Sequence, residues 1–445
     1  MAVIGIELVD AAVVAVRDGN RVAASPGLAL LEASGVAVGE AAAAQARLKP
    51  VLATDRFWSD LSAETFAQGA ATPVSHAELG YAHLASLWRA IAQPGDSAVF
   101  ALPGAMRLHQ VGLLHGLARR AGIAVAGTVD AAVAACAGRA ARGTVLHLDV
   151  QLHQAVLTEL AGATVLRRRR VDVTPRAGLK AMYAAWAQLV AEAMVRRTRF
   201  DPLHQAATEQ QLYERLPGWL EELARVESVD AVIETEAGSF AATLRREQLT
   251  LAVEAWYAQL AELVHAGHRA DEPATLALSA RAALLPALGE RLAALPGLEP
   301  ATLPLEAAAA GAAARAGEVG PAEPPTLVTA LARAIPAASA ARRRAAGARP
   351  THVIQDGRAH AIGPQPLVVG AGAGPGRRLP LAAGAGISRE HCALLAQDGE
   401  VLVRDTSRYG TWVNGERVEG EAVLAAGDRL RVGTPGVVLE LVAVG

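Results

Sequence analysis

Two kinds of hydrophobic pattern divide the chain. Over residues 1–319, short apolar runs typical of buried strands alternate with stretches in which apolar residues recur at helical spacing. Residues 97–102, SAVFAL, show the strand pattern, and residues 77–92, AELGYAHLASLWRAIA, show the helical one. Because strands and helices alternate along this region, the pattern predicts an α/β architecture.

The same patterns predict further elements of this region. We expect strands over 123–126, 144–160, 230–234 and 274–279, with a turn near residues 150–152 dividing the second of these into two. We expect helices over 108–121, 129–136, 244–265 and 282–294. Asp201 and Pro202 are expected to separate two helices, because Asp suits the N-cap and Pro suits the first helical position.

The region after residue 304 changes composition twice. Residues 305–319, LEAAAAGAAARAGEV, are predicted to form a helix, because alanine favours helix and Pro304 suits a helix start. Residues 320–350 mix proline, alanine and arginine, and we expect a linker there. Residues 351–445 show short alternating strands separated by Asp-Gly, Asn-Gly and Gly-Asp turns, a pattern typical of a β-sandwich.

Composition narrows the classes of function. The 445 residues carry a formal net charge of -2, so no overall field favours nucleic acid or an anionic membrane. Cys136 and Cys392 lack the paired spacing of a zinc site or a disulfide scaffold, and no apolar run is long enough to cross a bilayer. No catalytic Ser/His/Asp or Cys/His set is recognisable. We therefore expect a cytoplasmic protein that neither binds nucleic acid nor inserts into membranes, and that holds no metal.

The segment 386–433 carries the most specific motifs in the chain. These are Ser388-Arg389-Glu390-His391, then the run from Asp405 to Asn414-Gly415, then Gly427-Asp428. In order and spacing they resemble a forkhead-associated (FHA) domain. The resemblance covers residues 351–445 and implies a β-sandwich whose apical loops bind phosphothreonine peptides on a protein partner.

The resemblance also assigns roles to individual residues. It implies that Ser388 and Ser407 donate hydroxyl hydrogen bonds to the phosphate, while Arg389 and Arg408 flank it with charge. His391 would brace the binding loop from inside. The other supporting positions are Gly370, Gly410 and Asn414, the last as part of a tight hairpin turn with Gly415.

Two residues depart from the family pattern. Gly370-Ala371 stands where the family has Gly-Arg, and Tyr409 stands where it has Asn. A hydrogen bond to a charged group is worth about 1.5 to 3 kcal/mol, so loss of that arginine weakens binding about tenfold to a hundredfold. Arg377 or Arg378 offers a replacement from a different backbone position. Two alternatives stay open: a phosphopeptide site, and a protein-binding surface that needs no phosphate.

Four stretches of the first region together resemble the actin-like ATPase superfamily in its heat shock protein 70 branch. They are residues 4–14, 38–50, 98–138 and 305–319. The resemblance implies a two-lobed α/β domain that ends at about Val319. In that family, two glycine-containing hairpins bind the nucleotide phosphates through backbone N–H groups, which approach closely because glycine has no Cβ.

The residues expected to bind nucleotide have lost this chemistry. Val9 and Asp10 replace the glycine and the hydroxyl residue of the first hairpin, residues 150–153 provide no glycine in the second, and Ser279 begins a triplet in place of a Gly-Gly motif. The resemblance therefore implies a vestigial nucleotide site, to which we assign Glu7, Asp10, Asp149 and Ser279.

Two hypotheses of function follow. The first is a non-catalytic cytoplasmic adaptor or signalling scaffold, in which a pseudo-ATPase body (residues 1–319) is joined by a linker (320–350) to an FHA-like module (351–445) that docks a protein partner. This hypothesis requires no cofactor. The alternative is an active chaperone-like ATP-binding protein regulated by phosphorylation, which would require ATP and magnesium.

Overall fold

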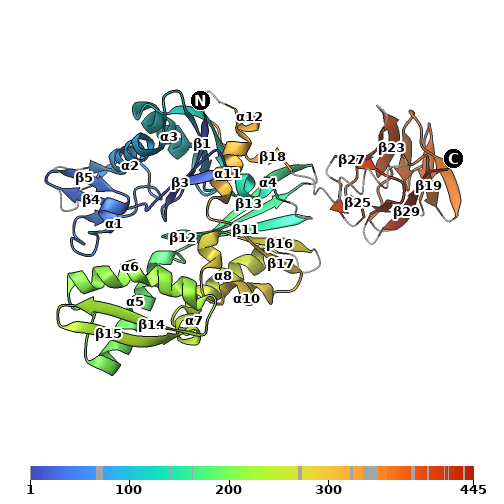
Figure 1. Ribbon diagram of the computed structural model, residues 1–445. Helices are drawn as coiled ribbons and strands as arrows, with labels where there is room; N and C mark the ends of the chain where they lie inside the picture. The colour runs from blue at the N-terminus through green and yellow to red at the C-terminus, as the bar shows by residue number, and fades with distance from the viewer. Residues whose placement is uncertain are drawn as a thin grey trace. The chain divides into compact units, whose positions relative to one another are not determined.

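The chain folds into two compact units (Figure 1). The first comprises Met1–Gly138, Thr144–Ala161 and Val165–Ala332, and the second comprises the remainder, chiefly Arg333–Gly445. The computed structural model describes residues 2–66, 74–139, 143–162, 164–268, 273–320, 324–333, 349–355, 357–381, 386–397, 400–414, 416–418, 420–433 and 436–444.

The first unit begins with a five-stranded mixed sheet. Its strand order is β10-β9-β1-β2-β3. Strand β1 pairs antiparallel with β2, β2 pairs antiparallel with β3, and β1, β9 and β10 run parallel. The strands are β1 (Val3–Leu8), β2 (Val13–Arg17), β3 (Asn20–Ser25), β9 (Ser97–Leu102) and β10 (Ala124–Asp130).

A second sheet of the same unit repeats this arrangement. Its order is β17-β16-β11-β12-β13-β18, in which β11, β12 and β13 are antiparallel neighbours and β11, β16 and β17 run parallel. Five of its strands therefore reproduce the order and directions of the first sheet. The strands are β11 (Thr144–Val150), β12 (Gln154–Ala161), β13 (Val165–Pro175), β16 (Ala274–Leu278), β17 (Leu298–Thr302) and β18 (Ala330–Ala332).

Helix α11 (Ala307–Ala314) packs against β1 and against α4 (Ala131–Ala137) (Figure 1). A Cβ on Gly5 would lie 1.9 Å from the carbonyl oxygen of Ala309, and a Cβ on Gly311 would lie 1.9 Å from that of Ala134. The backbones touch because small residues line both sides. The alanine-rich segment is therefore helical, as predicted, but it forms two helices, because α11 ends at Ala314 and the short helix α12 (Ala316–Val319) follows.

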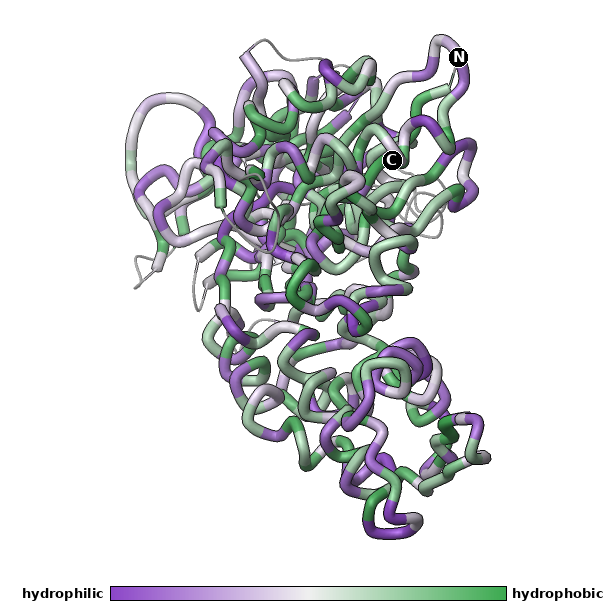
Figure 2. Tube along the Cα trace, turned by 90° about the vertical axis from the view of Figure 1, so that its left-hand side faces the viewer, coloured by the Kyte–Doolittle hydropathy of each residue, from purple (hydrophilic) through white to green (hydrophobic). Residues whose placement is uncertain are grey.

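Other helices complete the apolar cores of the first unit. Helices α2 (His76–Ile91) and α3 (Leu108–Arg120) contribute Leu79 and Leu114 to the core of the first sheet. Helices α5 (Leu179–Thr198), α6 (Ala206–Leu223) and α8 (Glu254–Gly267), with the hairpin of β14 (Ser228–Thr235) and β15 (Gly238–Arg245), surround Trp186 and Tyr257 in the core of the second. Figure 2 shows hydrophobic and hydrophilic residues alternating along the chain.

Smaller elements connect these parts. Strand β4 pairs with both β5 and β6, and β7 pairs with β8. The elements are β4 (Ala29–Glu32), β5 (Gly35–Val38), α1 (Glu40–Ala43), β6 (Ala53–Thr54), β7 (Thr65–Phe66), β8 (Val74–Ser75), α7 (Arg246–Ala252), α9 (Ala280–Ala283) and α10 (Leu288–Ala293).

Three predicted helix boundaries were wrong. The helix expected over 244–265 begins within β15 and breaks at Val253, between α7 and α8. The helix expected over 282–294 is interrupted at Pro286, which cannot donate a helical hydrogen bond, and α10 begins only after it. Asp201 is not an N-cap: its carboxylate accepts a hydrogen bond from the Leu203 amide within a turn, and α6 starts at Ala206.

Part of the segment expected as a linker, 320–350, belongs to the first unit. Residues 324–332 belong to that unit: β18 pairs with β13, and Val328 forms a bridge with Val129. Residues 321–323 and 334–348, including Arg342, Arg343 and Arg344, lie outside the described residues.

The second unit is built from two β-sheets that share one apolar core. Their orders are β20-β19-β29-β28-β25-β26 and β22-β21-β23-β24-β27. Val353 and Leu439 from the first sheet and Leu394 and Val403 from the second lie in the same buried cluster, as the predicted sandwich requires. The strands are β19 (His352–Gln355), β20 (Arg358–Ala361), β21 (Leu367–Gly370), β22 (Arg378–Pro380), β23 (Cys392–Gln397), β24 (Glu400–Asp405), β25 (Thr411–Val413), β26 (Glu416–Arg417), β27 (Glu421–Leu424), β28 (Arg429–Val432) and β29 (Val437–Val442).

Candidate functional site

Two loops at one end of the second unit hold the serines expected to bind phosphate. One loop precedes β23 and contains Ser388, and the other joins β24 to β25 and contains Ser407. The backbone N–H of Arg408 donates to the Ser388 hydroxyl oxygen at 3.2 Å, and the Thr406 hydroxyl donates to the carbonyl oxygen of Glu390 at 3.2 Å. These bonds fasten the two loops to each other.

His391 lies under both loops and is completely buried. Its Nδ1 accepts a hydrogen bond from the backbone N–H of Ser388 at 3.0 Å, and its Nε2 lies 2.6 Å from the carbonyl oxygen of Gly410. Because Nδ1 accepts and Nε2 faces an acceptor, the ring carries its proton on Nε2. The imidazole therefore connects the Ser388 loop to the Ser407 loop from below.

Two glycines allow the loops to take this form. Gly410 has a φ of 88°, a conformation that favours glycine. A Cβ on Gly370 would lie 2.4 Å from the carbonyl oxygen of Arg389, so a side chain there would push the Ser388 loop away. Gly370 thus supports the site through close backbone approach.

Each serine hydroxyl oxygen accepts one backbone hydrogen bond. The Ser407 hydroxyl oxygen accepts from the Gly410 N–H at 2.7 Å, as Ser388 does from Arg408. Asp405 holds this loop by accepting from the Ser407 N–H and the Thr411 hydroxyl. A hydroxyl has one hydrogen to donate, and within the part of the chain that the structure describes neither serine hydroxyl donates a hydrogen bond.

The structure gives the expected arginines different surroundings. Arg389 and Arg408 are exposed beside the serines, and the Tyr409 side chain next to them is 47% exposed. The Arg377 guanidinium instead donates to the carbonyl oxygens of Ala361 and Gln365. Arg378 forms an ion pair with Glu390.

Asn414 lies apart from these phosphate-site contacts and fixes a turn. Its side-chain oxygen accepts from the Arg429 N–H at 2.9 Å and its amide donates to Asp428 at 2.7 Å, while its φ is 54°. Its neighbour Gly415 lies outside the described residues.

Residues 368–433 match the family model of the FHA domain. The match covers the strands and loops described above, from β21 to the end of β28. FHA domains mediate protein interactions through phosphopeptides, and the match indicates a phosphopeptide-containing protein partner for this part of the chain. No curated protein matches the chain.

A second set of polar residues lies inside the first unit, where the two sheets have equivalent strands. Glu7 in β1 and Asp149 in β11 each stand one residue before the end of the first strand of their sheet. The Arg281 guanidinium joins them: its Nη2 lies 2.7 Å from Glu7 Oε1 and 3.0 Å from Asp149 Oδ1. All three side chains are at most 10% exposed. The result is a buried ion triad between the two sheets.

The triad changes the ionisation of its carboxyl groups. Burial raises the pKa of Glu7 above its ordinary value, and Arg281 opposes this effect. Burial acts in the same direction on Asp149, but there Arg281, together with His147 and hydrogen bonds from Ser279 and Gln151, holds the pKa below the ordinary value. The second oxygen of Glu7, Oε2, is buried and has no hydrogen-bond partner among the described residues. Ser279 caps α9, which carries Arg281, by accepting from the Ala282 N–H at 3.2 Å.

Asp10 lies across the turn of the second hairpin. Its carboxylate oxygens accept hydrogen bonds from the backbone N–H groups of Leu152 at 2.8 Å and His153 at 3.3 Å. Successive backbone N–H groups in a turn form a favourable site for an anion, and here the chain supplies its own. Asp10, expected only as a replacement for the hydroxyl residue of the first hairpin, therefore contacts the turn of the second.

Contacts between distant segments of the first unit extend outward from Asp10. Asp55, which follows β6, pairs with His153 at 3.1 Å and with Lys180 at 2.6 Å. Burial opposes ionisation of Asp55, yet the hydrogen bonds from His153 and Lys180 lower its pKa to about 2. In another contact between distant segments, the Arg47 guanidinium lies 3.5 Å over the ring centroid of Tyr213.

Within the described residues no group of three or more His, Cys, Asp or Glu side chains is arranged to hold a metal ion.

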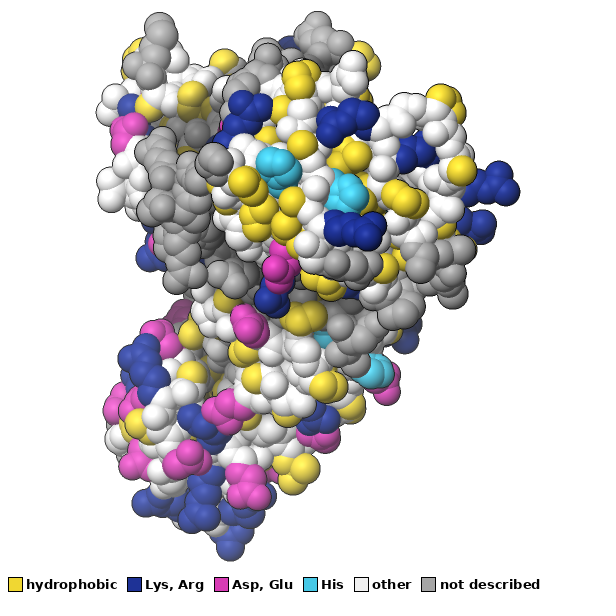
Figure 3. All heavy atoms as spheres, turned by 90° about the vertical axis from the view of Figure 1, so that its right-hand side faces the viewer, with side chains coloured by type: hydrophobic (Ala, Val, Ile, Leu, Met, Phe, Trp, Pro, Cys, Tyr) yellow, Lys and Arg dark blue, Asp and Glu magenta, His cyan; other side chains and the backbone are white. Residues whose placement is uncertain are grey.

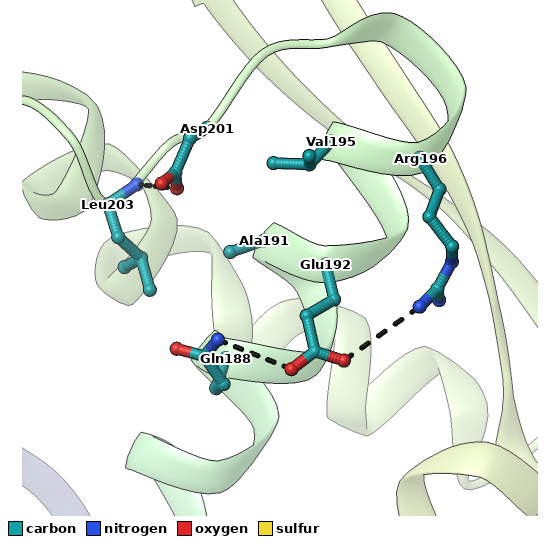
Figure 4. A pocket seen from close by; sticks show the side chains of 7 residues that line it. All are labelled: Gln188, Ala191, Glu192, Val195, Arg196, Asp201 and Leu203. Carbon is teal, nitrogen blue, oxygen red and sulfur yellow. Dashed lines mark hydrogen bonds and ion pairs between the residues drawn. The ribbon is translucent and has the colours of Figure 1, made fainter.

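Helix α5 borders a groove of about 330 Å³ (Figure 4). Its polar side chains satisfy one another: Glu192 accepts from Gln188 and pairs with Arg196, and Asp201 accepts from the Leu203 amide. Basic and acidic side chains also interleave over the lower part of the face drawn in Figure 3, and this lower part belongs to the first unit.

None of the helices in the described part of the chain is long and apolar enough to span a membrane.

Proposed function

We propose that the protein is a non-catalytic cytoplasmic adaptor whose FHA domain captures a protein partner carrying phosphothreonine. The observation that carries this proposal is the bond between the Arg408 N–H and the Ser388 hydroxyl oxygen, which joins the loop of Ser388 and Arg389 to the loop of Ser407 and Arg408. A phosphate dianion is bound best by such charge-assisted donors on rigid turns. This favours the phosphate-dependent version over a surface that needs no phosphate.

The proposal assigns the first unit to the actin-like ATPases as a degenerate member. The repeated strand order of its two sheets supports this assignment, because such a duplication places equivalent first hairpins on either side of one site. Glu7 and Asp149, the carboxylates singled out by resemblance, occupy equivalent positions in the repeat. Fold alone does not establish activity, which depends on the residues at the site.

The residues at this site do not fit magnesium and ATP. A magnesium ion needs oxygen ligands, but Arg281 already neutralises both carboxylates. Phosphate oxygens need backbone N–H groups, but Asp10 takes those of Leu152 and His153. In the proposed function these residues hold the body together without a nucleotide. The alternative, an active chaperone-like ATPase, would require Arg281 and Asp10 to leave buried contacts.

Capture of the partner from a cell lysate by the full chain tests the proposal. We expect capture to be lost when the lysate is treated with phosphatase, and to be lost equally with Ser388→Ala plus Ser407→Ala. Ser34→Ala, on an exposed turn of the first unit, is the matched control and should capture normally. Capture that survives both phosphatase and the double substitution would contradict the phosphothreonine proposal.

A further inference from the structure

We infer that Arg378 supplies the phosphate-binding charge that Ala371 lacks, and that Glu390 occupies Arg378 until a phosphorylated ligand displaces it. The inference rests on the proposed function, since it concerns how the FHA domain recognises a phosphomonoester. It names one arginine of the Pro-Gly-Arg-Arg sequence and gives Glu390 a role in specificity.

The fold places Arg378 beside the loop that lacks an arginine. Arg378 is the first residue of β22, which runs parallel to β21 with Val368 opposite Arg378, and β21 ends at Gly370 just before Ala371. The Arg378 side chain folds back over the intervening loop. Its Nε donates to the carbonyl oxygen of Pro375 at 3.3 Å, and a Cβ on Gly374 would lie 2.6 Å from Nη2.

Glu390 connects Arg378 to the phosphate loops. It lies between Arg389 and His391, and its carboxylate pairs with Arg378 at 2.5 Å. Its backbone carbonyl oxygen accepts the hydroxyl hydrogen bond from Thr406, at the start of the Ser407 loop. The Arg378 guanidinium is therefore tied to the residue that directly follows Arg389, and in the inferred complex it turns from Glu390 to a phosphate held by Ser388 and Ser407.

Arg377 is a poorer candidate for the same role. Its guanidinium donates to the carbonyl oxygens of Ala361, at the end of β20, and Gln365, before β21. Both bonds hold the Arg377 guanidinium on the backbone of residues 361–365, away from Glu390 in sequence. A phosphate would have to break both of these hydrogen bonds before it could bind the Arg377 guanidinium.

The exchange of Glu390 for phosphate is favourable because the two anions differ in charge. The side chain of Glu390 is 62% exposed and that of Arg378 is 16% exposed, so water weakens the pair mainly at its carboxylate end, where a stronger anion can replace Glu390. A phosphomonoester carries about -1.5 to -2 charge at pH 7 and offers oxygens for a two-pronged guanidinium contact. An acidic side chain on a peptide carries no more charge than Glu390 itself. Glu390 therefore discriminates phosphothreonine from aspartate or glutamate.

Fluorescence anisotropy with the full chain tests this inference. The probe is a labelled peptide mixture with a central phosphothreonine and random flanking residues, compared with matched mixtures that have threonine or glutamate at the centre. We expect Glu390→Gln to bind the phosphothreonine mixture about two- to fivefold more tightly than the unmodified chain, and to bind the glutamate mixture detectably. Arg378→Gln should bind the phosphothreonine mixture about tenfold or more weakly.

Matched variants separate failure of this inference from failure of the proposed function. Arg358→Gln, at an exposed position of β20, controls for loss of a positive charge and should leave binding unchanged. If binding depends on Ser388 and Ser407 but Glu390→Gln does not tighten it, or if Arg377→Gln weakens it more than Arg378→Gln, the assignment of Arg378 is wrong while the proposed function stands. If neither the unmodified chain nor Glu390→Gln prefers the phosphothreonine mixture, both are wrong.

Discussion

Arg281 lies 2.7 Å from Glu7, although 274 residues separate them in the sequence. The contact joins the first strand of one sheet to the helix that follows β16 in the other, and Asp149 completes it from β11. Removal of one member of such a buried pair leaves an unpaired charge in the interior, which lowers the free energy of unfolding. Several consequences of this relationship can be measured.

Removal of the Arg281 charge should destabilise the first unit. Arg281→Met keeps most of the side-chain volume but leaves Glu7 and Asp149 buried without a cation, and loss of one partner of a buried pair costs about 3 to 5 kcal/mol. We expect a loss of this order in the free energy of unfolding, measured in urea. Arg225→Met removes an exposed helix pair with Glu221 and should change the same quantity by no more than about 0.5 kcal/mol. Equal effects of the two substitutions would contradict the triad.

Acid should remove the contribution of the Asp55 cluster. The pKa of Asp55 is lowered in the folded protein from 3.8 to about 2, so its ionised form stabilises the fold above pH 4. This contribution falls progressively as the pH drops from about 4 to 2, because both states then bind the proton. The unfolding free energy of the unmodified chain should exceed that of Asp55→Asn by about 1 to 2 kcal/mol at pH 6. A difference that persists undiminished at pH 2 would show that ionisation of Asp55 is not its source.

Magnesium and ATP should not stabilise the protein. A ligand that binds only the folded state raises the melting temperature, but Arg281 and Asp10 occupy the groups that would bind nucleotide. We expect the melting temperature to be the same with and without millimolar magnesium and ATP. A rise that Asp149→Ala abolishes would support the active ATPase and refute the pseudo-ATPase.

The close packing of α11 predicts that two neighbouring glycines respond differently to substitution by alanine. Gly311→Ala would place a Cβ 1.9 Å from the Ala134 carbonyl oxygen, and overpacking of this kind costs about 1 to 3 kcal/mol or more. Gly317→Ala, in α12, meets nothing within 4 Å and should be neutral or slightly stabilising. Urea unfolding of both variants gives the comparison. A harmless Gly311→Ala would mean that α11 does not pack against α4.

The local pattern of hydrophobic and polar positions predicted much of the fold, because a strand or a helix can be identified from the spacing of a few residues. Strand β9 and helices α2 and α3 follow the expected boundaries closely, and the alanine-rich α11 was expected from propensity. The errors arose where one residue interrupts a pattern, as Pro286 does before α10. Pattern also could not show that residues 324–332 add β18 to a sheet, since that pairing is made with β13, far away in sequence.

Motif spacing identified the FHA loops but not the contacts inside them. Ser388, Arg389, Ser407 and Arg408 lie on the two loops to which their motifs assigned them. The pairing of Arg378 with Glu390 was not foreseen, because it depends on how β22 returns beside β21. Arg281 was missed as well. Its sequence signal was its place as the third residue of the triplet 279–281, which stands where the family has a Gly-Gly motif.

Above all, we propose that the FHA domain binds phosphothreonine in preference to threonine. The most direct test of this proposal is the ratio of the affinities of the full chain for the phosphothreonine peptide mixture and for the matched threonine mixture, measured by anisotropy. We predict a ratio of about ten or more, because charge-assisted hydrogen bonds to phosphate are each worth about 1.5 to 3 kcal/mol, and we predict that Ser388→Ala plus Ser407→Ala reduces the ratio toward one. A ratio of one for the unmodified chain would contradict the claim.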